Sequence, residues 1–89
     1  MNRFADETAA EIYQWRFAQG VEQHLSVATH KLLNRLVATT TMDDVDVYGP
    51  IYNWPNAPGR FGILVEGKWY LTFQWLEGQG AFEIRLERR

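Results

Sequence analysis

Apolar residues in the first half of the chain recur three or four positions apart, as they do on one face of a helix. The first stripe consists of Ala9, Ile12, Tyr13 and Phe17, and the second consists of Leu25, Ala28, Leu32 and Leu36. Asp6 or Thr8 can cap the first helix, because a side-chain oxygen there accepts a bond from a free backbone amide. Gly20 favours the end of that helix, because glycine accepts the left-handed conformation. We predict helices over about residues 6–19 and 22–38.

The second half alternates apolar and polar residues with the two-residue period of β-strands. On the central strand Trp69, Leu71, Phe73 and Trp75 take one face, and Lys68, Tyr70, Thr72 and Gln74 take the other. On the last strand Phe82, Ile84 and Leu86 take one face, and Glu83, Arg85 and Glu87 take the other. We predict strands over about residues 61–65, 68–75 and 81–87. Three prolines make residues 49–59 an irregular loop, because proline removes amide donors.

This order of elements predicts one α+β domain over residues 1–89. Two N-terminal helices pack on one face of a small antiparallel sheet and cover its apolar side. The row that begins at Lys68 then faces away from the helices. Because that row is polar, it is either a solvated surface or a binding site.

Charge places any anion-binding surface in the second half of the chain. The net charge is −2, but residues 1–48 hold four basic and seven acidic groups, whereas residues 49–89 hold five and four. The chain has no cysteine, which excludes disulfides and thiolate metal sites. No apolar run reaches the ~20 residues of a membrane span, and the N-terminus does not resemble a secretory signal. We therefore expect a cytoplasmic protein without a membrane partner.

The sequence predicts neither a metal site nor a cofactor. His24 and His30 are six positions apart on one predicted helix, so they do not share a face as a helical metal pair would. Asp43, Asp44 and Asp46 lack the glycine-centred loop of a calcium site. A solvated turn is the simpler interpretation of these aspartates.

Four segments, in order, together with the glycine turn that follows the last of them, resemble the HigB-type toxins of the RelE/ParE superfamily. FADET at residues 4–8 is similar to the start of that family, and ATHKLLNRL at residues 28–36 is similar to its second helix. ATTTMDDV at residues 38–45 resembles its acidic turn. GKWYLTFQW at residues 67–75, followed by a glycine turn, resembles its central hairpin. The resemblance covers nearly all of the chain.

The resemblance implies the toxin of a type II toxin–antitoxin pair. Such toxins cut messenger RNA in the ribosomal decoding site without a metal ion. A helix-turn-helix antitoxin neutralises them, and operator DNA is reached only through that antitoxin. Three departures from the family concern the site. Tyr70 stands where the family has arginine, residues 49–54 lack the family's charged groups, and the chain ends Glu87-Arg88-Arg89 instead of Asp-Tyr-His.

The outward row supplies the candidate site residues. Tyr70, Lys68 and Arg85 are the catalytic candidates, because RNA cleavage needs proton transfer and cations for the phosphate. Candidate RNA or phosphate contacts are Arg60, Gln74, Tyr52, Trp54, Arg88 and Arg89. For Tyr70 and for the two loop aromatics, the alternative is an ordinary structural role.

Two further interpretations of the whole chain stay open at this point. The protein is alternatively a non-catalytic diverged toxin or an antitoxin-binding partner that acts on a non-ribosomal target. The low net charge and the few acid–base groups favour that class. A third interpretation is an unrelated small α+β interaction domain.

Overall fold

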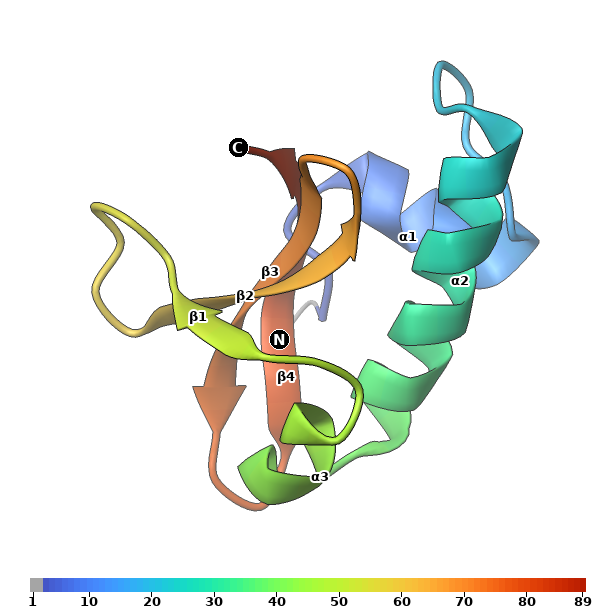
Figure 1. The fold of residues 1–89 in the computed structure, drawn as a ribbon. Helices are drawn as coiled ribbons and strands as arrows, with labels where there is room; N and C mark the ends of the chain where they lie inside the picture. The colour runs from blue at the N-terminus through green and yellow to red at the C-terminus, as the bar shows by residue number, and fades with distance from the viewer. Residues whose placement is uncertain (1–2) are drawn as a thin grey trace.

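The computed structural model describes residues 3–89 and consists of three helices followed by four strands (Figure 1). The elements are α1 (Glu7–Trp15), α2 (Gln23–Ala38), α3 (Met42–Asp46), β1 (Ile51–Asn53), β2 (Arg60–Glu66), β3 (Trp69–Leu76) and β4 (Gly80–Arg88). Positions 1–2 of the predicted domain lie outside the described residues. No helix within residues 3–89 has the length and apolarity that a membrane crossing requires.

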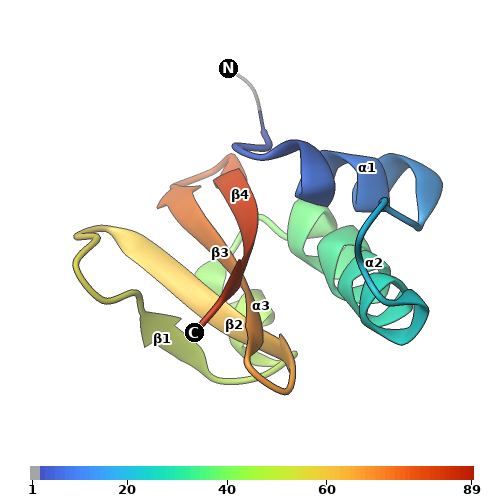
Figure 2. The same cartoon turned by 90° about the horizontal axis from the view of Figure 1, so that it is seen from above.

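The four strands form one antiparallel sheet in the order β1-β2-β3-β4. Figure 2 shows α1 and α2 together on one side of this sheet. Helix α1 contacts β4, and α2 contacts both β2 and β4. Before α1, the chain runs parallel to β4, where Ala5 N–H donates to Ile84 O at 2.9 Å. The predicted α+β class, with helices on one face of an antiparallel sheet, is confirmed.

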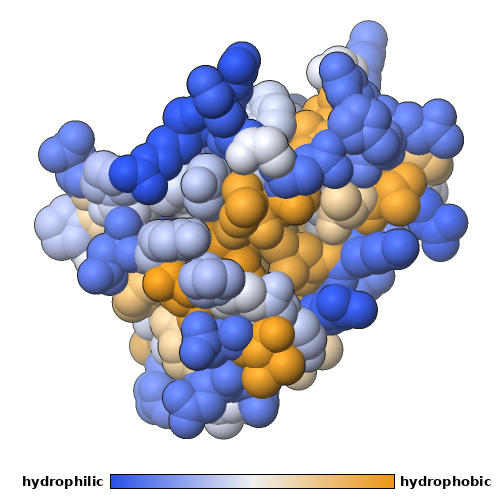
Figure 3. Space-filling model, viewed as in Figure 1, coloured by the Kyte–Doolittle hydropathy of each residue, from blue (hydrophilic) through white to orange (hydrophobic). Residues whose placement is uncertain are grey.

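The core lies between the helices and the sheet. Its completely or almost completely buried apolar side chains include Ile12, Leu33, Leu36, Ile63, Leu71, Phe73 and Ile84. Leu71 and Phe73 face the helices, as alternation predicts, and Trp69 and Trp75 are half-buried against the core. A space-filling view shows apolar side chains in a hollow between the sheet and α2, surrounded by polar ones (Figure 3).

Helix α1 is shorter than predicted. It ends at Trp15 because Arg16 takes the left-handed conformation, with φ of 72°, and donates its N–H to Ile12 O at 2.8 Å. Phe17 therefore lies beyond the helix and is exposed, so its predicted place in the apolar stripe is wrong. At the other end Asp6 is the cap, and its Oδ1 accepts from Ala9 N–H at 2.6 Å.

Strand β4 contains an irregularity that alternation does not predict. Thr72 pairs with Arg85, but Gln74 pairs with Phe82, so β4 has one extra residue there. Phe82 consequently shares a face with Gln74, and the prediction that it points with Ile84 and Leu86 is wrong. Ala81 takes the core position instead and is buried. Two short elements, α3 and β1, also replace segments predicted as turn and loop.

Candidate functional site

Strand register gathers Tyr70, Thr72 and Gln74 of the predicted polar row with residues of β2 and β4 on the sheet face away from the helices. Gly62 and Arg85 flank Thr72, while Leu64 and Glu87 flank Tyr70. We call this surface the outer face. It comprises Tyr52, Arg60, Gly62, Leu64, Tyr70, Thr72, Gln74, Phe82, Arg85 and Glu87.

Three aromatic rings meet on the outer face. Tyr52 meets Tyr70 edge-on, with 6.2 Å between ring centroids and 82° between planes. Trp54 packs on the same Tyr70 at 5.4 Å and 60°. Both arrangements lie within the range of favourable aromatic pairs. We call Tyr52, Trp54 and Tyr70 the aromatic corner; Tyr52 is its most open member, with 42% of its surface exposed.

Gly62 allows Trp54 to lie on the sheet. A Cβ atom added to Gly62 would come within 2.7 Å of Trp54 Cε3, closer than real contacts allow. Trp54 is half-buried in this position, and its backbone N–H donates to Arg60 O at 2.8 Å. The loop predicted before the sheet is therefore folded back over β2.

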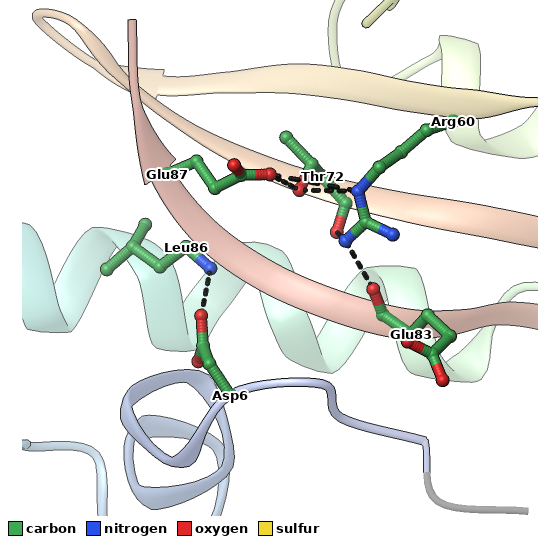
Figure 4. A network of polar contacts seen from close by, with 6 residues as sticks. All are labelled: Asp6, Arg60, Thr72, Glu83, Leu86 and Glu87. Atoms are coloured by element: carbon green, nitrogen blue, oxygen red, sulfur yellow. Dashed lines mark hydrogen bonds and ion pairs between the residues drawn. The ribbon is translucent and has the colours of Figure 1, made fainter. Parts of the chain in front are cut away.

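A buried arginine spans three strands of the outer face (Figure 4). Arg60 is only 6% exposed. Its Nε donates to Thr72 Oγ1 at 3.1 Å, and its Nη2 donates to Thr72 O at 3.2 Å and also to Glu83 O. The Thr72 hydroxyl in turn donates to Glu87, whose carboxylate lies 3.7 Å from Arg60 Nε. Fully buried Thr72 thus links the arginine to the carboxylate.

These bonds change the role expected for Arg60. Burial lowers the pKa of its guanidinium, and the like charge of Arg85 lowers that pKa further. The Nε and Nη2 donors of this guanidinium already have partners, because they bond to two backbone carbonyls and a hydroxyl. Arg60 therefore links the strands of the outer face. The sequence predicts a free phosphate-binding cation at this position, but the guanidinium is buried and bonded within the sheet.

The network also explains the irregularity in β4. Glu83 has a φ of 54°, a conformation that non-glycine residues rarely adopt. Its carbonyl oxygen accepts a bond from Arg60. Such outliers persist where the surrounding structure holds them. Sequence reasoning missed Thr72, Glu83 and Glu87 as one unit, because their bonds to Arg60 join separate strands.

The remaining candidates do not all converge. Arg85 is exposed on the outer face, and Gln74 is half-buried beside Arg60. Lys68 is exposed in the turn between β2 and β3, where its carbonyl accepts from Arg89 N–H at 2.8 Å. Arg88 pairs with Trp69 and lines a cleft on the helix side. Arg88 therefore lies away from the outer face on which it was expected.

The chemistry available on the outer face is limited. In residues 3–89 both histidines belong to α2, so the side chains left on the outer face for proton transfer are Tyr52, Tyr70 and Glu87. Lys68 and Arg85 can attract an anion, and the aromatic corner can stack on a flat group. Among the described residues, no three histidine, aspartate or glutamate side chains gather as metal ligands would.

Comparison with known proteins adds no assignment. The chain matches no described protein family, and no curated protein is similar to it in sequence.

Proposed function

We propose that this protein is the toxin component of a type II toxin–antitoxin system and that its outer face binds single-stranded RNA. The aromatic corner is the observation that carries the proposal. The exposed cation Arg85 lies on the same sheet face, and the exposed cation Lys68 lies in the turn two residues before Tyr70. Stacking on an aromatic ring contributes about 1–3 kcal/mol per unpaired base. Lysine and arginine attract the backbone phosphates, independently of sequence.

The architecture supports the resemblance on which the toxin assignment rests. Two N-terminal helices lie on the reverse side of the sheet, so the outer face remains accessible around Tyr52 and Arg85. The partners that follow from the proposal are a helix-turn-helix antitoxin, the ribosome and messenger RNA. Operator DNA would be contacted through the antitoxin alone. These partners place the protein in the cytoplasm.

RNA cleavage is the reaction that the proposal implies, with Tyr70, Lys68 and Arg85 as its catalytic residues. Lys68 and Arg85 would stabilise the charge that develops on the phosphate. Tyr70 would take part in moving a proton from the attacking 2′-hydroxyl or to the leaving oxygen. Arg60 is bound within the sheet and cannot move to the phosphate without losing its bonds. We therefore expect slow cleavage that depends on the ribosome.

RNA binding is tested by fluorescence anisotropy with a labelled single-stranded RNA oligonucleotide. Tyr52→Ala should weaken binding roughly fivefold or more, because it removes a stacking surface. Lys68→Ala and Arg85→Ala should each weaken binding. Each should also reduce the slope of log K against log salt concentration by about one. Tyr48→Ala and Lys31→Ala are the matched controls, because both residues are exposed outside the outer face. Equal losses in the controls would remove the basis for the proposal.

Cleavage is tested in a bacterial cell-free translation system with purified protein. Tyr70→Phe keeps the ring and removes the hydroxyl, so it should abolish cleavage while leaving RNA binding nearly unchanged. If no message is cut, or if Tyr70→Phe cuts as well as the unaltered protein, the catalytic part of the proposal is wrong.

A second candidate function is a non-catalytic toxin or antitoxin partner. It is favoured by the engagement of Arg60 in the sheet and by the location of both histidines on α2. Expression in bacteria without an antitoxin distinguishes the two. Growth arrest with intact messenger RNA indicates a target other than messenger RNA, whereas no arrest indicates an inert partner. Arrest with cut messages supports the first function.

A further inference from the structure

A cleft of about 370 Å³ opens on the helix side of the sheet, at the end where β4 terminates. Its floor is apolar and its rim is charged. The residues that line it are Gly20, Val21, Glu22, His24, Leu25, Glu66, Trp69 and Arg88. They come from the connection between α1 and α2, from α2 itself and from three strands. The cleft therefore lies at the seam where the helices meet the sheet.

His24 bridges this seam through both ring nitrogens. Its Nε2 lies 2.5 Å from Glu22 Oε2, and its Nδ1 lies 2.6 Å from Glu66 Oε2. A carboxylate only accepts, so both hydrogen bonds form at the same time only when the ring carries two protons. The two carboxylates contact opposite sides of the ring, and together they hold an imidazolium ion. The bond to Glu66, followed by the bond to Glu22, raises the pKa of His24 above its ordinary value.

The bridge occurs at the N-terminus of α2, where the N-cap side chain is not used for capping. Glu22 is the N-cap residue of α2, and its side chain makes no capping bond to the helix. Its carboxylate contacts His24 instead. A positive charge in the first turn of a helix is unfavourable, because the helix dipole is positive there. Protonated His24 is therefore held by the carboxylates against the dipole.

We propose that His24 is a proton-operated clasp that fastens the start of α2 to the end of β2 across this cleft. With two protons, the ring ties Glu22 on the helix side to Glu66 on the sheet side. With one proton, it can donate to only one carboxylate, and one side of the bridge is lost. Loss of the clasp frees the entrance to the cleft and exposes Trp69 on its floor.

The charged groups around His24 determine the direction of the effect. Glu22 faces it from the connection before α2, Glu66 faces it from β2, and Arg88 lines the same cleft from β4. On α2 itself, Lys31 lies along the same side of the helix. The two carboxylates are in direct contact and outweigh the two cations. Because the folded-state pKa is raised, the clasp is complete below the ordinary histidine pKa of about 6.5 and is lost as pH rises through the folded-state value.

The experiment is an NMR titration of both histidines in the complete chain. His30 lies on the same helix and separates a general effect of pH on α2 from the effect at His24. Its Nδ1 donates to Ile12 O at 2.9 Å, and its Nε2 accepts from Asn34 Nδ2 at 3.1 Å. His24 should titrate above its ordinary value, and Glu66→Gln should lower its pKa, because the bond to Glu66 is the largest cause of the rise. Glu77→Gln, which alters an exposed glutamate in another turn, should leave it unchanged.

The indole N–H of Trp69 reports on the cleft in the same spectra. Its chemical shift should change with the midpoint of His24 in the unaltered protein, and that change should disappear in His24→Gln. If Glu66→Gln leaves the pKa of His24 unchanged, the clasp is overturned. A Trp69 signal that is constant across the titration overturns the link to the cleft. Both results are independent of RNA binding, so they leave the proposed function unaffected.

Discussion

Trp54 packs so closely over Gly62 that a methyl group on the glycine would lie 2.7 Å from the indole ring. The aromatic corner therefore depends on a residue that has no side chain. Gly62 is buried in the middle of β2, where a larger residue would ordinarily strengthen a strand. Its presence there is explained by the tryptophan above it.

Gly62→Ala tests this relationship. The added methyl group should push Trp54 off the sheet and lower the free energy of unfolding by about 1–3 kcal/mol, the usual cost of overpacking. Chemical denaturation followed by circular dichroism measures the change. In a Trp54→Ala background the same substitution should be neutral or stabilising. An equal cost in both backgrounds would show that Trp54 is not the cause.

Thr72→Val tests the hydroxyl that joins Arg60 to Glu87. Valine keeps the shape of threonine but neither accepts from Arg60 nor donates to Glu87. We expect a loss of about 1–3 kcal/mol in the free energy of unfolding, because buried polar groups lose their partner. Thr72→Ser is the matched control, since it keeps the hydroxyl and should cost clearly less. If serine and valine cost the same, packing rather than hydrogen bonding accounts for the loss.

Asp6→Ala tests the carboxylate that joins α1 to β4. Oδ1 caps the helix at Ala9, and Oδ2 accepts from Leu86 N–H at 3.0 Å. Loss of a helix cap costs about 1 kcal/mol, and the unpaired amide of Leu86 should add to it. Thr8→Ala is the control, because Thr8 lies inside the helix and should change stability by less than about 0.5 kcal/mol. Equal effects would mean that Thr8 shares the capping role.

Phe73→Ala tests which face of the sheet carries the core. Phe73 is fully buried against the helices, so its truncation should cost about 3–5 kcal/mol. Leu64→Ala, on the outer face, should cost less than about 1 kcal/mol, because that leucine is 43% exposed. Thermal unfolding of the two variants measures the contrast. A larger cost at Leu64 would contradict the arrangement of the two layers.

Strand alternation is sufficient to predict the helix-facing side of β3. Leu71 and Phe73 lie where the two-residue period places them, because β3 is an internal strand whose pairing with both neighbours is regular from Tyr70 to Thr72. The same rule fails for Phe82, since one inserted residue in β4 changes the face of everything before it. The rule uses only neighbours along one strand, and an inserted residue is held by partners on other strands.

The candidate site is predictable in outline but not in the role of its arginine. Tyr70 and Arg85 lie on the outer face, where strand alternation places them. Tyr52 joins them from β1, in a segment that the sequence predicts as an irregular loop. Arg60 instead turns into the sheet, because its partners Thr72 and Glu83 are 12 and 23 residues away along the chain. No local pattern in β2 shows that such distant acceptors will converge on one guanidinium.

The extra residue in β4 makes chain length a determinant of the fit between the two layers. From Thr72 to Gln74 strand β3 advances two positions, while β4 advances three, from Phe82 to Arg85. Deleting Glu83 would equalise the count, and Phe82 would still stand opposite Gln74. Phe82 and Ala81 would keep their faces, but Arg60 would lose a carbonyl partner. The extra residue therefore lets Phe82 point outward, whereas an uninterrupted strand of the same sequence would place it beside Ile84 in the core.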